Sequence, residues 1–116
     1  VEHGYSECLA QATIVEQARG LARDVHYWDK GQHLERMRAS GRFRATKELA
    51  VHHAEPGNAE RLVQLALSQG QLATLLKHGA SEGEIGITAL RATARRALGD
   101  ASTLWYWSYR VRVGIK

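Results

Sequence analysis

Apolar side chains recur at steps of three and four residues from Ser6 to Val25, which is the spacing of one face of an α-helix. Asp29, followed by Gln32, resembles a capping box and predicts the start of a second helix. Gly41 is suited to end that helix, because glycine adopts the left-handed backbone of a helix C-terminus without strain. The pattern therefore predicts that residues 1–41 are helical.

The period changes to two after this segment, and residues 42–53 are predicted to form a strand with one buried face. Its apolar face carries Phe43, Ala45, Leu49 and Val51. The strand is expected to end at His52 and His53, whose side chains point to opposite faces because they are adjacent. The segment Glu55–Asn58 contains a proline and a glycine and is predicted to be a turn.

Residues 59–98 are predicted to form a helical segment of several short helices. The first, over residues 59–70, has the clearest amphipathic pattern in the chain. Further along, Ser81 and Glu84 match a capping box for a short turn. Thr88 is expected to cap the helix that follows.

The last segment, residues 104–115, alternates large apolar side chains with polar or small ones and is predicted to be a strand. Its bulky face carries Trp105, Trp107, Tyr109, Val111, Val113 and Ile115. We expect this strand to pair antiparallel with residues 42–53 and to pack its apolar face against helices 59–69 and 89–98. Trp107 is then expected to be among the most buried residues. The predicted fold class is α+β, with helices and a two-stranded antiparallel pair in a single domain or domain fragment.

Such a sheet is incomplete by itself. A two-stranded sheet is marginal in water, and a few short helices cannot cover one face and also protect both long edges. We therefore expect a partner subunit or more chain to complete it. The first residue is Val1 and not methionine, which fits a processed or trimmed chain or the last part of a longer one.

The composition of the 116 residues is that of an ordinary globular protein, with 44% apolar and 24% charged residues. No apolar run approaches the roughly 18 residues of a membrane-spanning helix, and the first residues lack the layout of a signal peptide. Cys8 is the only cysteine, so the chain forms no internal disulfide. We expect a cytoplasmic protein without a membrane segment, in which Cys8 is a packed thiol.

Positive charge gathers at the end of the chain. The formal net charge is +4, and residues 91–116 contribute +5 because six basic residues stand there against one acidic residue. A basic strand that also carries Trp105, Tyr106 and Trp107 suits stacking with single-stranded nucleic acid. The interpretation we favour is structural, with helical arginines complementing a helix C-terminus and strand arginines forming a solvated face. Nucleic acid is kept as an alternative partner.

The common signatures of metal and nucleotide sites are absent from the sequence. There is no His-Glu-x-x-His and no cysteine pair with zinc spacing. Glycine-rich phosphate loops and the Gly-x-Ser-x-Gly of hydrolases are also missing. His52 and His53 face opposite ways and so are poorly placed to share a metal ion. We expect no metal site.

Residues 105–116, with the sequence WYWSYRVRVGIK, resemble the closing strand of small-molecule S-adenosylmethionine-dependent methyltransferases of the Rossmann-like class, of a type common in actinobacteria. Residues 33–44 look like the last core helix of that family running into the penultimate strand, and residues 46–53 look like the rest of that strand. Residues 59–70 and 79–99 look like the helical insertion before the final strand.

The resemblance implies that the chain is the C-terminal, substrate-side part of such an enzyme, at the tail of its α/β sheet. The family's first strand leads into a glycine-rich loop for the cofactor, and the second ends in an acidic residue that holds the ribose. Neither is in this sequence. The intact enzyme would use S-adenosylmethionine, whereas no cofactor is expected to bind this chain alone. The implied partners are a missing N-terminal half or partner subunit and a small-molecule substrate.

The resemblance also suggests site residues, because ligands of open α/β sheets bind beyond the carboxyl ends of the parallel strands. His52 and His53 would lie on that side, where either is a candidate catalytic base. His26, Tyr27 and Trp28 would border the substrate pocket, and the segment 59–98 would cap it. Two other functions stay open: a small basic α+β module that binds nucleic acid, and a homodimeric ligand-binding or interaction subunit.

Overall fold

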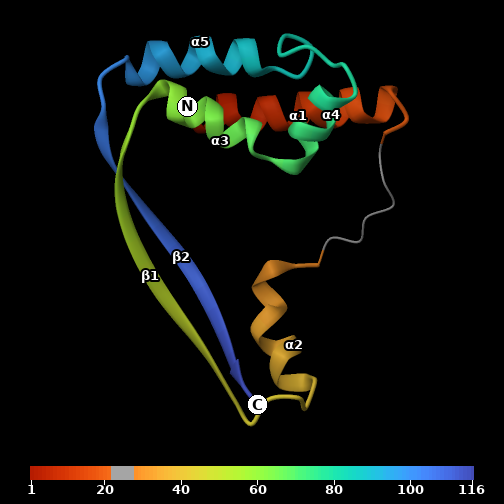
Figure 1. Cartoon of the computed structure of the whole chain (residues 1–116), viewed down its shortest axis with the longest axis vertical. Helices are drawn as coiled ribbons and strands as arrows, with labels where there is room; N and C mark the ends of the chain where they lie inside the picture. Colours follow the sequence, from red (N-terminus) through yellow and green to blue (C-terminus); the bar gives the residue numbers. More distant parts are fainter. Residues whose placement is uncertain (22–27) are drawn as a thin grey trace. The chain divides into compact units, whose positions relative to one another are not determined.

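The computed structural model describes residues 1–21 and 28–116, and within them the fold is α+β, as predicted. These residues form five α-helices, one short 3-10 helix and two strands (Figure 1). In chain order the elements are α1 (Glu2–Ala18), η1 (Lys30–Gln32), α2 (His33–Ala39), β1 (Ala45–Gly57), α3 (Ala59–Leu67), α4 (Gly70–Lys77), α5 (Ile87–Leu98) and β2 (Thr103–Ile115).

The chain divides into two compact units. The first contains α1, α3, α4 and α5 and is called the helical unit below. The second contains η1, α2 and most of β1 and β2, and is called the ribbon unit. Each unit is described by itself.

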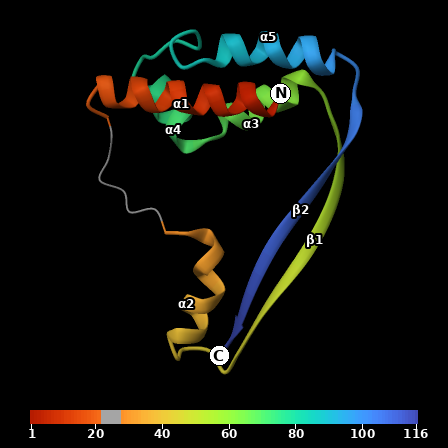
Figure 2. The ribbon, with the colours of Figure 1, turned by 180° about the vertical axis from the view of Figure 1, so that it is seen from behind.

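The helical unit holds the hydrophobic core. Helix α1 packs against α4 and α5, and α3 packs against α4 and α5, so the four helices share one apolar interior (Figures 1 and 2). All of the buried apolar side chains among the described residues lie in this unit. The largest of them are Leu72, Leu75, Ile85, Ile87, Leu90 and Val63. Cys8 also belongs to this core as a packed side chain. Burial raises the pKa of its thiol, which disfavours the reactive thiolate form.

Local sequence signals start and end these helices. The side chain of Asn58 caps α3 by accepting a hydrogen bond from the Arg61 amide at 2.9 Å. The predicted capping box is confirmed, because the Ser81 amide donates to Glu84 Oε2 at 2.7 Å and the Glu84 amide donates to Ser81 Oγ at 3.2 Å. The prediction that Thr88 caps the next helix is wrong.

Helix α5 begins two residues earlier than predicted, at Ile87, and its N-cap is Gly86. Gly86 has a φ of +80°, a left-handed backbone that favours glycine. A Cβ at this position would also lie 3.2 Å from Cα of Cys8. The close approach of α1 therefore fixes the start of α5, and a side-chain cap is not needed.

The capping box makes stability depend on pH. Hydrogen bonds from the Ser81 amide and from Arg19 and Ser81 side chains lower the pKa of Glu84 from 4.5 to about 2. A depressed pKa in the folded state means stabilisation that is complete above about pH 4.5 and is lost as the pH falls toward 2. Glu84→Gln is therefore expected to lower the melting temperature above pH 5 and to match the unmodified protein near pH 2. Thermal denaturation from pH 2 to 7 measures this, with the exposed Asp100→Asn as the control; a constant difference across the range would contradict it.

In the ribbon unit, β1 and β2 run antiparallel, as predicted, and lie side by side in both views (Figure 2). The contacts between them fix the register. The Arg44 amide donates to the carbonyl of Ile115 at 2.8 Å, the side chains of Glu48 and Arg112 meet at 2.9 Å, and His52 meets Ser108 at 2.9 Å. As the residue number rises along β1, the number of the paired residue in β2 falls, which is antiparallel pairing.

Strand β1 is shifted toward the C-terminus from its predicted range of residues 42–53. It starts at Ala45 and continues through Pro56 to Gly57, so the turn predicted at Glu55–Asn58 is wrong. A proline is tolerated in a strand that has a neighbour on only one side, because its missing N–H can face away from the ladder. His52 and His53 therefore lie inside the strand and do not end it.

One face of the ribbon is apolar and exposed. We call it the apolar face; its exposed members, which are 38% to 50% accessible, are Leu49, Val51, Tyr109, Val111, Val113 and Ile115. Trp107 is half-buried, so the prediction that it is among the most buried residues is wrong. The helices bury their apolar stripes against one another in the helical unit, and the core forms there without the strands.

Candidate functional site

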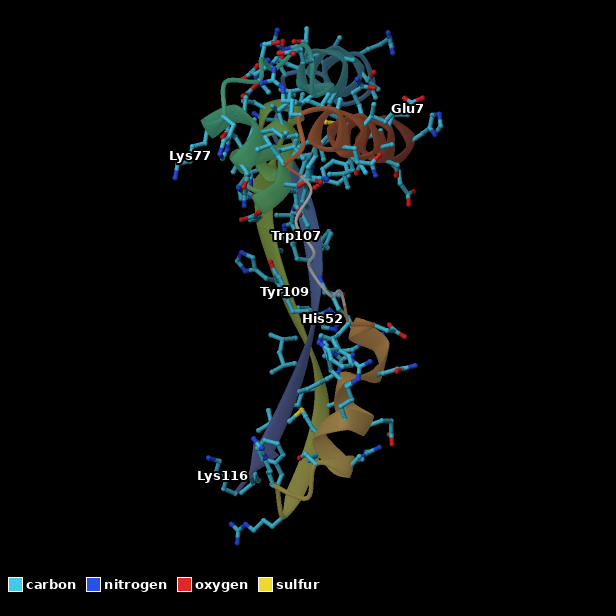
Figure 3. The ribbon with its side chains drawn as sticks, turned by 90° about the vertical axis from the view of Figure 1, so that its right-hand side faces the viewer. Glu7, His52, Lys77, Trp107, Tyr109 and Lys116 are labelled. Carbon is cyan, nitrogen blue, oxygen red and sulfur yellow. The ribbon has the colours of Figure 1, made fainter. Side chains whose placement is uncertain are left out.

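His52 and Ser108 form a polar pair at the middle of the ribbon. They face each other across β1 and β2, with His52 Nδ1 2.9 Å from Ser108 Oγ (Figure 3 shows where His52 lies along the ribbon). When Nδ1 carries the proton and donates it to Ser108, the imidazole is held in one orientation and the lone pair of Nε2 is free. His52 is then arranged to accept a proton from a bound ligand.

A shallow depression of about 620 Å³ surrounds this pair and includes Glu48 and Arg110. Glu48 binds two guanidinium groups, that of Arg112 at 2.9 Å and that of Arg110 at 3.5 Å. The polar face of the ribbon thus brings an imidazole, a hydroxyl, a carboxylate and two guanidinium groups onto neighbouring positions. Such a set can orient a polar ligand and exchange a proton with it.

His53 points to the opposite face, as its position beside His52 predicts. Its Nε2 lies 3.8 Å from a carboxylate oxygen of Glu55. Glu55 also accepts a hydrogen bond from the indole N–H of Trp107 at 3.0 Å. The structure therefore separates the two histidines, and only His52 belongs to the depression on the polar face.

Of the three residues predicted to border a substrate pocket, His26 and Tyr27 lie outside the described residues. Trp28 precedes η1 and is 59% exposed. The guanidinium of Arg36 stacks over its ring, 4.2 Å from the ring centre, in a cation–π contact. A role for Trp28 in substrate binding stays a prediction.

Sequence reasoning missed Ser108, Glu48 and Arg110 as members of this site. Ser108 is 56 residues from His52 in the chain, and no sequence signal joins the two. Only the register of the two strands brings them together, and a connection through three helices leaves that register undetermined by the sequence.

The resemblance implies that S-adenosylmethionine is held at a junction from a strand into a helix, and such a junction occurs among the described residues. Among them, the only strand that leads directly into a helix is β1, which meets α3 at Gly57 and Asn58. The Asn58 side chain already occupies the first-turn amide of Arg61, and Glu60 places a carboxylate at the same helix end. This junction has one glycine and lacks the glycine-rich turn that the resemblance implies for the cofactor.

Acidic partners offset several of the basic residues. Arg110 and Arg112 share Glu48, and Arg91 contacts Glu82 at 2.7 Å and Glu60 at 3.6 Å. These pairs reduce the positive field around the arginines concerned and leave the alternative of a nucleic-acid-binding module open. Within residues 1–21 and 28–116, no three histidine, cysteine or acidic side chains gather as metal ligands would.

Comparisons with known protein families, with curated proteins and with solved structures find no match to this chain. In the part of the chain that the structure describes, no helix has both the length and the apolar character that crossing a bilayer requires.

Proposed function

We propose that this chain is the C-terminal, substrate-side part of an S-adenosylmethionine-dependent methyltransferase that acts on a small molecule. The observation that carries the proposal is the ribbon: two paired strands of 13 residues each, with a large apolar face exposed. Residues 33–53 resemble the last core helix and penultimate strand of that enzyme class, and residues 105–116 resemble its closing strand. This resemblance indicates which sheet the ribbon would complete.

The ribbon has the properties of the end of a larger sheet. In the described residues each strand has one neighbour only, so one backbone edge of each is open. Open edges of this length and exposed valines are unfavourable in a free protein and are normally paired or covered. Sheets of the Rossmann-like class pack helices against their apolar faces, which accounts for an apolar face of this kind.

The contribution of this chain to the reaction would come from the polar face. His52, oriented by Ser108, is the candidate base for a proton that a substrate hydroxyl or amine loses when it is methylated. The cofactor would be held by the other half of the sheet, in the same polypeptide or in a partner, because this sequence has no glycine-rich turn of the kind that holds it. The chain alone is therefore not expected to be catalytic.

The reading frame upstream of the codon for Val1 tests the proposal most cheaply. We expect it to encode a buried strand, a glycine-rich turn and a helix, followed by a second strand that ends in an acidic residue. The same elements in the gene of a co-purifying subunit would also support the proposal. Their absence from both places would contradict it.

A further inference from the structure

A second hollow lies in the ribbon unit, apart from the depression around His52. It has a volume of about 720 Å³ and opens beside α2, at the end of the ribbon where β1 begins and β2 finishes. The side chains that determine its chemistry are those of His33, Arg36, Met37, Arg42, Phe43 and Arg112. Three guanidinium groups and no carboxylate line it, so the lining has a single sign of charge.

The three arginines are held to different degrees. Arg36 is fixed by the Trp28 ring at 4.2 Å and by Gln32 Oε1 at 3.2 Å, and the described residues give it no carboxylate partner. Arg112 donates from Nε to Glu48 at 2.9 Å, which fixes the side chain and leaves its terminal nitrogens for another acceptor. Arg42 is exposed, and its side chain makes no ion pair among the described residues. The hollow therefore presents two guanidinium groups that have no carboxylate partner among the described residues, those of Arg36 and Arg42, and a third, that of Arg112, which is paired with Glu48.

The floor of the hollow is apolar. Phe43 lies directly on the backbone of Gly114, since a Cβ built on that glycine would be 2.5 Å from the Phe43 ring. The missing side chain at Gly114 lets the ring lie against the end of β2. Met37 lies on α2 and lines the same hollow, and methionine adapts to flat or irregular ligands.

We propose that this hollow binds a small organic anion, with its carboxylate among Arg36, Arg42 and Arg112 and its aromatic or branched body against Met37 and Phe43. Guanidinium groups pair with carboxylates in bidentate fashion, and a pocket that combines an apolar floor with a few polar groups is typical of small-ligand sites. The proposal goes beyond the proposed function and does not depend on it. The hollow and the His52 depression have different lining residues, and they are joined only by the ion pair of Arg112 with Glu48.

The sequence offers a site-specific reporter for this hollow. Met37 is the only methionine in the chain, so ¹³C-methyl labelling of methionine gives one signal, and that signal lies in the hollow. The probe is 2-naphthoate, and the matched neutral probe is 2-naphthalenemethanol. We expect 2-naphthoate to shift the Met37 signal saturably and to bind about tenfold more tightly than the alcohol, as charge-assisted hydrogen bonds imply.

Two arginine variants test whether the guanidinium group of Arg42 binds the carboxylate of 2-naphthoate. Arg42→Gln is expected to weaken 2-naphthoate binding about tenfold and to leave alcohol binding unchanged. Arg44→Gln is the matched control, because Arg44 is exposed, lies two positions along the chain and does not line the hollow. Circular dichroism checks that both variants are folded. The proposal is overturned if the Met37 signal does not respond, if both probes bind equally, or if the two variants weaken binding equally.

Discussion

Leu75→Ala is expected to lower the free energy of unfolding of the helical unit by about 2–5 kcal/mol, the usual range for truncating a buried leucine. The Leu75 side chain is fully buried on α4, a helix that packs against α1 and α3. Domains of this size have a total stability of about 5–10 kcal/mol, so the variant is expected to be partly unfolded. Urea denaturation followed by helical circular dichroism measures the loss.

Ile14→Ala is the control for this change. Ile14 lies on α1 with 59% of its surface exposed, so its truncation is expected to change stability by no more than about 0.5 kcal/mol. An equal loss in both variants would show that the core does not lie where the packing of the four helices places it.

Val113→Lys is expected to have different effects in the free chain and in the native gene product that contains residues 1–116. In the chain, Val113 is 38% exposed on the apolar face, so lysine can extend into water and the melting temperature is expected to change little. The proposed function implies that this face is covered in the native product. An unpaired ammonium group buried there is expected to lower the free energy of unfolding by about 3–5 kcal/mol. We expect the variant of the native product to be insoluble or to lose cofactor binding.

Ala73→Lys is the matched control, because Ala73 is an exposed position on α4 and is expected to accept lysine in both proteins. Equal tolerance of Val113→Lys in both proteins would contradict the covered face. If Val113→Lys instead converts a dimer of the free chain into monomers in sedimentation, the apolar face is the interface of a homodimer, which is the alternative interaction subunit.

Local signals in the sequence predicted most of the secondary structure. The Ser81–Glu84 capping box is present as predicted, and Gly41 has the positive φ of +65° expected at the end of α2. The α+β class followed from the change of period after residue 41. These features depend on neighbours within four residues, so the sequence pattern is sufficient to find them.

Features that depend on distant residues were not predictable. Alternation of apolar and polar residues shows that one face of a strand is apolar, but it does not show what covers that face. It therefore predicts a buried Trp107, whereas the core consists of residues of the helical unit alone. The pairing of His52 with Ser108 depends on strand register, which no short turn fixes here. The proline and glycine of residues 55–58 predict a turn after a strand that ends at His53, although a strand with one neighbour can contain Pro56.

Calorimetric titration of S-adenosylmethionine tests the central claim most directly, with the native gene product that contains residues 1–116 measured beside the chain alone. The account predicts one cofactor bound per copy of the native product and no measurable heat of binding for the chain, because its sequence lacks the glycine-rich turn that the resemblance implies for the cofactor. Micromolar binding to the chain alone, or no binding to the native product, would contradict it.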